Sequence, residues 1–321
     1  MVIIINAAGK ILMNPLNVAI TIRSFDTASE AYKKLIAAAR VSYLNSTGLH
    51  LSEQALCSAL KYADISIAGT EKYTRAVIDA APQLKIISRV GIGLDSIDLD
   101  AAEERGIRVL NTPGSTIQPV AEHTLALLLA VLKQIPDYNY RMRDGDFSIR
   151  PGTLLAGKRV GIIGLGRIGK KVASFLEILG CSIGYYDPYV NLKDRNGWYK
   201  YASIGELLAH AEIVTIHSSA QQGNACIIDK TALDGITKGI ILINTARGSL
   251  VNENALIAGL MDGRIRAAGL DVFPQEPYSG PLLSFPQVIA TPHIASNTIE
   301  SRKEMEMEAV KNILDRIKRL T

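Results

Sequence analysis

The sequence predicts an α/β protein of two domains, each built on a doubly wound parallel sheet. Short runs of β-branched residues alternate with amphipathic helical stretches, which is typical of parallel strands joined by crossover helices. A glycine-rich turn at residues 164–169 stands between one such strand and the helix that follows it. The length of 321 residues exceeds one ordinary core, because domains average roughly 150 residues.

The first hundred residues carry three predicted strands and one clearly capped helix. Strands are expected at 17–23, 65–68 and 85–90. Ser52 is the expected N-cap of a helix over 52–62, because its hydroxyl can accept a first-turn N–H and apolar residues follow at helical spacing. These elements are expected to form the first sheet and one of its covering helices.

A nearly all-apolar stretch over Val120–Ile135 predicts a buried helix that lies between domains or between subunits. Its longest unbroken apolar run, Leu125–Leu132, has eight residues, whereas about twenty are needed to cross a bilayer. No membrane association is therefore expected. The tail from Thr298 predicts a helix of mixed charge, which could return to pack on the first domain.

From Lys158 the alternation of strands and helices starts again and is more regular. Six strands are expected, at 159–163, 182–186, 213–217, 240–244, 267–270 and 288–290. Helices are expected between them, at 167–179, 204–209 and 252–261. Six short strands with intervening helices predict a complete doubly wound domain.

Charge and cysteine content exclude several classes of protein. Thirty-five basic and thirty-one acidic side chains leave a net charge of +4, which is too small for a dedicated nucleic-acid protein. The first ten residues, MVIIINAAGK, lack the basic start of a signal peptide. Cys57, Cys181 and Cys226 form no C-x-x-C pair, which favours reduced thiols in a cytoplasm over disulfides or a metal site.

The turn Gly164-Leu165-Gly166-Arg167-Ile168-Gly169 predicts a dinucleotide site, because a strand precedes it and a helix follows it. Gly164 permits the tight turn, Gly166 lets the backbone approach a pyrophosphate, and Gly169 lets helix and strand pack closely. The helix N-terminus offers unpaired N–H groups to the phosphates. A purely structural turn is the alternative, and the register of all these parts disfavours it.

The next strand ends at Asp187, where a carboxylate suits a ribose. It can accept hydrogen bonds from both ribose hydroxyls and would repel a 2′-phosphate. The sequence therefore predicts NAD as the cofactor, in preference to NADP.

Three ionisable residues, Arg247, Glu276 and His293, each lie just past a predicted strand of the second domain. In an open α/β sheet the carboxyl ends of the strands face the ligand crevice. Taken singly, the three could be surface charges and a loop histidine. At one sheet edge beside a predicted dinucleotide site, they instead indicate a catalytic site.

The reaction that needs these groups is hydride transfer to a 2-oxo acid. A guanidinium fork can hold the substrate carboxylate and polarise its carbonyl together. An imidazolium can deliver the proton, and a neighbouring carboxylate would orient the ring and favour its charged form.

The sequence resembles the D-isomer-specific 2-hydroxyacid dehydrogenases, especially the D-3-phosphoglycerate dehydrogenase-like branch. The resemblance covers the chain from about Thr47 and rests on Arg89–Asp98, Asn111–Gly114, Val120–Glu122, the glycine turn and the three catalytic segments. It implies that Arg247 binds substrate, that Glu276 supports the histidine, and that His293 donates and accepts the proton.

The resemblance also implies further contacts and an architecture. The implied NAD contacts include Arg167, Ile168, Asp187, His217, Thr245, Ala246 and Asp271, although a strand-end cap is an equal interpretation of His217. Backbone at Val90 and Gly91 is implied to face the substrate carboxylate. The implied architecture is a flavodoxin-like substrate domain, 1–110 plus 297–321, into which a Rossmann NAD domain, 111–296, is inserted. The long apolar helix and the arm after it are implied to form a homodimer.

The identity of the substrate is left open by the sequence. The leading candidate is 3-phosphoglycerate, but Ala68 stands where the serine-biosynthetic relatives carry a phosphate-binding arginine. Lys72 and Arg75 lie nearby, and an ordinary charged helix start explains them better than a phosphate clamp. Glyoxylate and hydroxypyruvate remain alternatives.

Two other features of the sequence depart from the family. Residues 218–224 replace its usual proline-containing loop. No regulatory domain is expected after Thr321, and serine feedback through such a domain is therefore not expected either. An NADH-sensing corepressor-like binding protein is the alternative from a different functional class.

Overall fold

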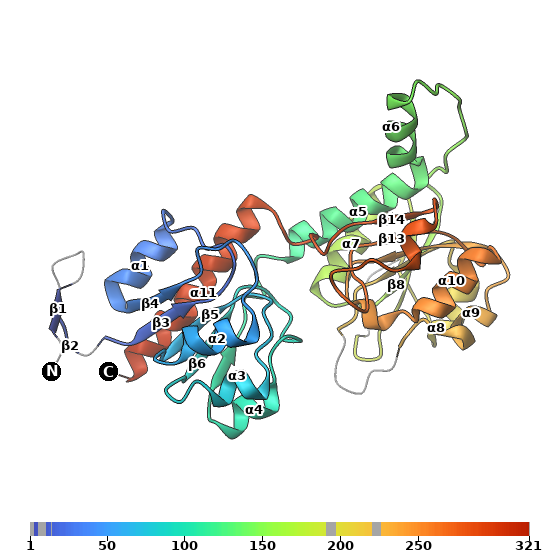
Figure 1. Ribbon diagram of the computed structural model, residues 1–321. Helices are drawn as coiled ribbons and strands as arrows, with labels where there is room; N and C mark the ends of the chain where they lie inside the picture. The colour runs from blue at the N-terminus through green and yellow to red at the C-terminus, as the bar shows by residue number, and fades with distance from the viewer. Residues whose placement is uncertain (1–2, 6–10, 14, 191–196, 220–225, 321) are drawn as a thin grey trace. The chain divides into compact units, whose positions relative to one another are not determined.

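The computed structural model describes residues 3–5, 11–13, 15–190, 197–219 and 226–320. The chain divides into two compact units, Met1–Thr116 with Thr298–Thr321, and Ile117–Asn297 (Figure 1). We call them unit 1 and unit 2. The predicted domain boundaries lie between residues 110 and 111 and between residues 296 and 297.

Unit 1 is built on a five-stranded parallel sheet in the order β4-β3-β5-β6-β7. Its strands are β3 (Asn17–Ile20), β4 (Arg40–Leu44), β5 (Ile65–Ala68), β6 (Ile86–Arg89) and β7 (Arg108–Leu110). Counted along the chain from β3, this is the order 2-1-3-4-5, which is the flavodoxin-like order. A separate antiparallel pair joins β1 (Ile3–Ile5) to β2 (Ile11–Met13).

Helices cover both faces of this sheet. On one face lie α1 (Glu30–Ala38) and α11 (Ile299–Leu320), and on the other α2 (Glu53–Leu60), α3 (Arg75–Asp79) and α4 (Leu99–Glu104). Successive strand residues feed the two cores in turn, because side chains alternate along a strand: Val18 and Ile20 join the first and Ala19 the second. Ser52 caps α2 as predicted, with its hydroxyl accepting the Ala55 N–H.

Unit 2 is built on a seven-stranded parallel sheet in the order β10-β9-β8-β11-β12-β13-β14. Its strands are β8 (Arg159–Ile163), β9 (Ser182–Tyr186), β10 (Tyr199–Lys200), β11 (Ile213–Ile216), β12 (Ile240–Asn244), β13 (Ile265–Leu270) and β14 (Val288–Ala290). Counted from β8, the order is 3-2-1-4-5-6-7, which begins with the Rossmann order. The predicted class of two doubly wound α/β domains is confirmed.

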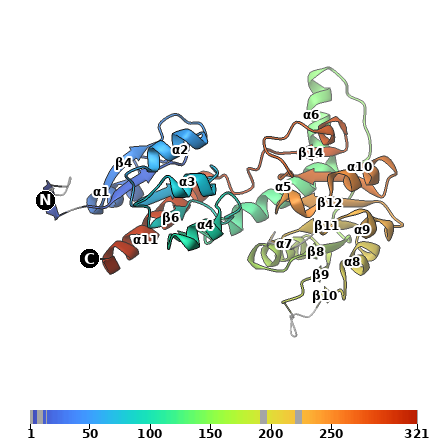
Figure 2. The same cartoon turned by 60° about the horizontal axis from the view of Figure 1, so that its bottom comes forward.

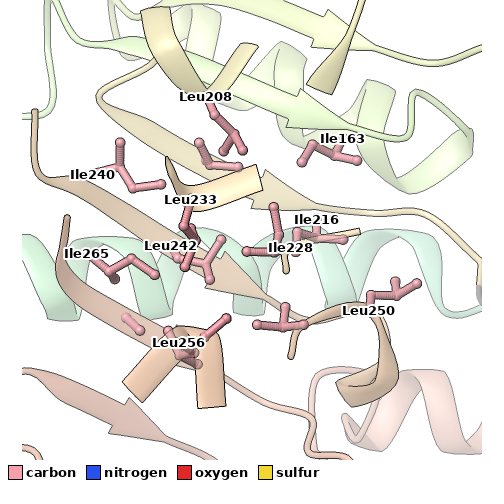
Figure 3. Packing of buried hydrophobic residues seen from close by; sticks show 14 of the residues in the cluster. Ile163, Leu208, Ile216, Ile228, Leu233, Ile240, Leu242, Leu250, Leu256 and Ile265 are labelled. Carbon is pink, nitrogen blue, oxygen red and sulfur yellow. The ribbon is translucent and has the colours of Figure 1, made fainter. Parts of the chain in front are cut away.

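The unit 2 sheet also packs helices on both faces (Figure 2). On one face lie α5 (Ile117–Lys133) and α7 (Arg167–Ile178), and on the other α8 (Ile204–His210), α9 (Lys230–Asp234) and α10 (Glu253–Met261). Figure 3 shows aliphatic side chains of the strands, such as Leu242, meeting Leu208, Leu233 and Leu256 of the three helices. This packing fixes the strand ends that carry the candidate site.

The long apolar helix differs slightly from its prediction. It runs from Ile117 to Lys133 rather than from Val120 to Ile135, and Gln134 follows in a left-handed conformation, with φ of 54°. A second helix, α6 (Ile135–Arg143), then begins and buries none of its side chains. None of the described helices combines the length and apolar character that crossing a membrane requires.

Candidate active site

The glycine turn between β8 and α7 is too tightly packed for side chains at two of its three glycines. Gly164 has φ of +89°, and a Cβ there would lie 2.7 Å from the backbone of His217. A Cβ on Gly169 would lie 2.1 Å from the Gly164 carbonyl oxygen. At Gly166, by contrast, no described atom lies within 4 Å of an added Cβ. Gly166 therefore leaves open space at the start of α7.

The N-terminus of α7 suits an anionic ligand. Gly166 is its N-cap, and no side chain caps the first turn. The helix is 12 residues long, so its first N–H groups and the positive end of its dipole point into the space beside Gly166. The residues predicted to contact the pyrophosphate, Arg167 and Ile168, are the first two of the helix.

Asp187 follows β9 and lies beside the same turn. Its carboxylate is buried and accepts the N–H of Leu165 at 2.7 Å and those of Tyr189 and Val190 at 2.8 and 3.0 Å. These bonds fix both carboxylate oxygens at the strand end, one of them against the turn. An acidic group is therefore held in place where a ribose would lie beside a dinucleotide pyrophosphate.

The candidate catalytic residues follow three neighbouring strands of the sheet. Arg247 comes after β12, Glu276 after β13 and His293 after β14. Because these strands are parallel, the three residues share the carboxyl edge of the sheet.

His293 and Glu276 form a direct pair. His293 Nδ1 lies 2.7 Å from Glu276 Oε2, while Glu276 Oε1 accepts the Phe273 N–H at 3.0 Å. The carboxylate is an acceptor, so Nδ1 carries the shared proton and Nε2 is left for exchange with a substrate. Partial burial raises the pKa of Glu276, but the hydrogen bonds from His293 and Phe273 outweigh it and hold that pKa below its ordinary value.

Arg247 is half-buried and stands on a loop that Asn244 fixes. The Asn244 side chain accepts the Ala246 N–H and donates to the Arg247 carbonyl, both at 3.0 Å. The guanidinium Nη1 donates to the Ala246 carbonyl at 2.7 Å. The hydroxyl of Thr245 lies 2.9 Å from that of Thr124 on α5.

Asp271, predicted to contact NAD, is fully buried under the His293 loop. Its carboxylate accepts the Thr291 hydroxyl at 2.6 Å and the N–H groups of Ile294 and Ala295 at 2.9 and 2.8 Å. Burial raises the pKa of Asp271, but bonds from His123, Thr291 and this backbone lower it below its usual range. The partners of His123 in the fold are Thr291 and Asp271.

His217 lies at the end of β11, against the glycine turn. Its backbone N–H donates to the Ile163 carbonyl at 2.7 Å, and its Nε2 lies 2.9 Å from the Thr215 hydroxyl. Burial lowers its pKa to about 3, so the ring is neutral near pH 7. Of the atypical segment after it, residues 220–225 lie outside the described residues.

In unit 1, the backbone at Val90 and Gly91 already has partners. The Val90 N–H donates to the Ala68 carbonyl at 2.9 Å, and the Gly91 N–H to the Thr112 hydroxyl at 2.6 Å. The expected role of these two residues towards a substrate carboxylate stays a prediction.

The candidate phosphate-binding cations of unit 1, Lys72 and Arg75, are both exposed. Arg75 is paired with Glu104 at 2.6 and 3.0 Å. Among the described residues, no three His, Cys, Asp or Glu side chains gather as a metal site would require.

Comparison with known proteins identifies the family. Residues 125–295 match the model of the D-isomer specific 2-hydroxyacid dehydrogenase, NAD binding domain. The chain is 42% identical over 241 residues to a D-3-phosphoglycerate dehydrogenase of Mycobacterium bovis, covering 74% of this chain but only 46% of that relative. It is 35% identical to a hydroxypyruvate reductase of Thermotoga maritima, covering 84% of this chain and 90% of that relative.

Solved structures agree over nearly the full length of the chain. The TT0316 protein of Thermus thermophilus superposes with a TM-score of 0.82 at 34% identity, covering 93% of this chain and 96% of that one. An acyclic imino acid reductase in complex with NADPH and D-Arg superposes with a TM-score of 0.84 at 26% identity, covering 95% and 98%. The chain belongs to the D-isomer specific 2-hydroxyacid dehydrogenase family.

Proposed function

We propose that this chain is an NAD-dependent D-2-hydroxyacid dehydrogenase that interconverts a small D-2-hydroxy acid and its 2-oxo acid. The observation that carries the proposal is the 2.7 Å pair between His293 and Glu276 at the same sheet edge as Arg247. A proton carrier and a guanidinium at the carboxyl edge of a dinucleotide-binding sheet are what carbonyl reduction requires.

In the proposed reaction, Arg247 binds the substrate carboxylate and polarises the carbonyl through its planar fork. His293 delivers a proton from Nε2 to the carbonyl oxygen during reduction and removes it during oxidation. Glu276 keeps the ring oriented and stabilises its charged form. The bound nicotinamide supplies or accepts the hydride.

The residues around the glycine turn fit NAD. We propose that Gly164, Gly166, Arg167, Ile168 and Gly169 cradle the pyrophosphate, and that Asp187 binds the ribose. His217, Thr245, Ala246 and Asp271 complete the proposed cofactor contacts. The open space at Gly166 and the uncapped helix N-terminus support this assignment.

The cofactor preference is a direct test of Asp187. Its fixed carboxylate would lie close to a 2′-phosphate, and two like charges at short range disfavour binding. We expect kcat/KM to be higher with NADH than with NADPH. Equal values would show that Asp187 does not face the ribose.

The relatives indicate two candidate substrates, which differ in the group at the end far from the carboxylate: a phosphate in one and an uncharged tail in the other. The Mycobacterium bovis relative is a D-3-phosphoglycerate dehydrogenase, and the Thermotoga maritima relative is a hydroxypyruvate reductase. We keep 3-phosphoglycerate as the leading candidate, and Lys72 is the residue to test as its phosphate ligand. The Arg75–Glu104 pair favours the second candidate, an uncharged tail, because that guanidinium is already bound.

The test of the proposed function is NADH oxidation with glyoxylate, hydroxypyruvate and 3-phosphohydroxypyruvate. Turnover with any of them supports the dehydrogenase, and a tenfold preference for the phosphorylated acid that Lys72→Ala abolishes supports 3-phosphoglycerate. NADH binding without turnover on the whole panel would favour the corepressor-like alternative.

We also propose a homodimer in the cytoplasm. The segment between α6 and β8, which we call the arm, exposes apolar side chains such as Phe147 and Ile149. A partner subunit would cover them. All three cysteines are free, which suits a reducing compartment.

A further inference from the structure

Two consecutive residues of α5, His123 and Thr124, contact the two loops that carry the candidate catalytic residues. His123 Nε2 lies 3.1 Å from the Thr291 hydroxyl and 3.4 Å from Asp271 Oδ1, under the loop of His293. The Thr124 hydroxyl lies 2.9 Å from that of Thr245, two residues before Arg247. Neighbouring helix residues point about 100° apart, so one turn of α5 can reach both loops.

The direction of each bond follows from its neighbours. The Thr291 hydroxyl donates to Asp271, so it accepts from His123, whose Nε2 must carry the proton. The Thr124 hydroxyl donates to the Val120 carbonyl at 2.7 Å, so it accepts from Thr245. Both contacts are thus parts of continuous hydrogen-bond chains.

The His293 loop needs such support. His293 has φ of 54°, a conformation that residues other than glycine rarely adopt. Its N–H donates to the Asp271 carbonyl at 2.8 Å, and the Asp271 carboxylate binds the two following N–H groups. Asp271 therefore holds the backbone of His293 and of the two residues after it. The Asp271 carboxylate is in turn held by Thr291, which accepts a hydrogen bond from His123.

We propose that His123 and Thr124 are positioning residues, His123 for the proton-transferring loop and Thr124 for the substrate-binding loop. The proposal rests on the proposed function in assigning these roles to His293 and Arg247. A misplacement of about 1 Å can cost up to a hundredfold in rate, so the loss of either contact is measurable.

The two contacts predict different kinetic losses. His123→Phe keeps an aromatic ring but removes the Nε2–H donor. The kcat for 2-oxo acid reduction should therefore fall about tenfold to a hundredfold with little change in KM. Thr124→Val removes the acceptor of Thr245 at nearly constant volume, so KM for the 2-oxo acid should rise by about tenfold. His123→Gln and Thr124→Ser, which retain a donor and a hydroxyl, should recover most of each loss.

The control is Lys133→Ala, an exposed position on the last turn of the same helix, which should keep wild-type kinetics. Wild-type kcat and KM in both His123→Phe and Thr124→Val would overturn the proposal. A lower melting temperature with unchanged kinetic constants would likewise overturn it, since that shows a structural role alone.

A second measurement separates this proposal from the proposed function. The chain has five histidines, so the ring resonances of His293 can be assigned by NMR with His293→Gln. His123→Phe should shift the His293 ring signals, whereas Lys133→Ala should not. If the wild type turns over no 2-oxo acid, the proposed function fails, and an unchanged His293 signal in His123→Phe would then overturn the positioning role as well.

Discussion

In the proposed reaction His293 gains and loses a proton in each cycle, which depends on the carboxylate of Glu276 beside it. His293→Gln removes this proposed proton carrier, and general acid catalysis is commonly worth about 10²–10⁴ in rate, so a loss of that order is expected in kcat. Glu276→Gln should cost less, because the ring remains but its charged form is less favoured. Reduction by Glu276→Gln should therefore decline at a lower pH than in the wild type.

The measurement is kcat/KM for 2-oxo acid reduction across pH in the wild type and both variants. Superimposable profiles for the wild type and Glu276→Gln would remove Glu276 from the proton-transfer pair.

His217 predicts a pH dependence of stability rather than of rate. Its pKa is about 3 in the folded chain against an ordinary 6.5, so between these values only the unfolded chain binds its proton. The free energy of unfolding should therefore fall as the pH is lowered from neutral towards 3. His217→Gln should reduce this fall, as measured by urea unfolding near pH 7 and near pH 5.

The exposed His210 is the control for His217. His210→Gln should retain the wild-type dependence on pH. If His217→Gln and the wild type lose stability in parallel on acidification, His217 is solvated rather than buried.

At the residue scale the sequence identifies Arg247, Glu276 and His293 by their place after a strand, and the structure brings them to one sheet edge, while their roles stay predictions. It fails for His123, because its partner Thr291 lies 168 residues away in the chain. Only the packing of α5 on the sheet brings them together, and no local spacing reports that contact.

The glycine turn gives a prediction at the scale of the element. Gly169→Ala places a methyl group against the Gly164 carbonyl, at 2.1 Å for the ideal Cβ, so helix and strand must separate and the melting temperature should fall. Gly166→Ala meets no described atom within 4 Å, so stability should be kept while NADH binding weakens.

Thermal unfolding and NADH fluorescence titration measure the two effects on one pair of variants. Equal loss of NADH affinity and of melting temperature in both variants would contradict separate roles for the two glycines.

The elements that the sequence predicts best are the central strands. β8, β11 and β12 are flanked by other strands and almost wholly buried, so each is a short run rich in valine and isoleucine. In the two large sheets the prediction omitted β4, β7 and β10, which lie at sheet edges, and it also omitted the separate pair β1 and β2. β4 buries none of its residues, and β7 and β10 have only three and two residues. The exposed β4 and the very short β7 and β10 show too little apolar periodicity to be recognised, although the equally short edge strand β14 was predicted.

For the whole molecule, the residue pattern alone does not specify which domain the C-terminal helix joins, and only the family resemblance implied the first domain. Its apolar stripe fits any complementary face. The structure packs α11 against α1 and β6 of unit 1, and the Ala309 carbonyl accepts the buried Ser88 hydroxyl at 3.0 Å. The chain thus returns to its first unit after completing the second, a connection that periodicity alone does not specify.

The proposed dimer is tested on the arm that follows α6. Phe147 and Ile149 expose 75% and 90% of their surface, and two large apolar residues so close together would suit a surface that a partner subunit covers. Ile149→Asp would place a charge in that interface and should yield monomers in sedimentation equilibrium. Ile178→Asp, at an 81% exposed position at the end of α7, is the matched control and should leave the dimer intact.

A wild type that sediments as a monomer would contradict the proposed dimer. A dimer that persists in Ile149→Asp would show that the subunits contact each other elsewhere. A substitution at an exposed surface position usually changes the free energy of unfolding by no more than about 0.5 kcal/mol. If the wild type is a monomer, both substitutions should therefore leave its melting temperature nearly unchanged. A dimeric wild type would instead lose melting temperature with Ile149→Asp alone, since association stabilises the folded chain by mass action.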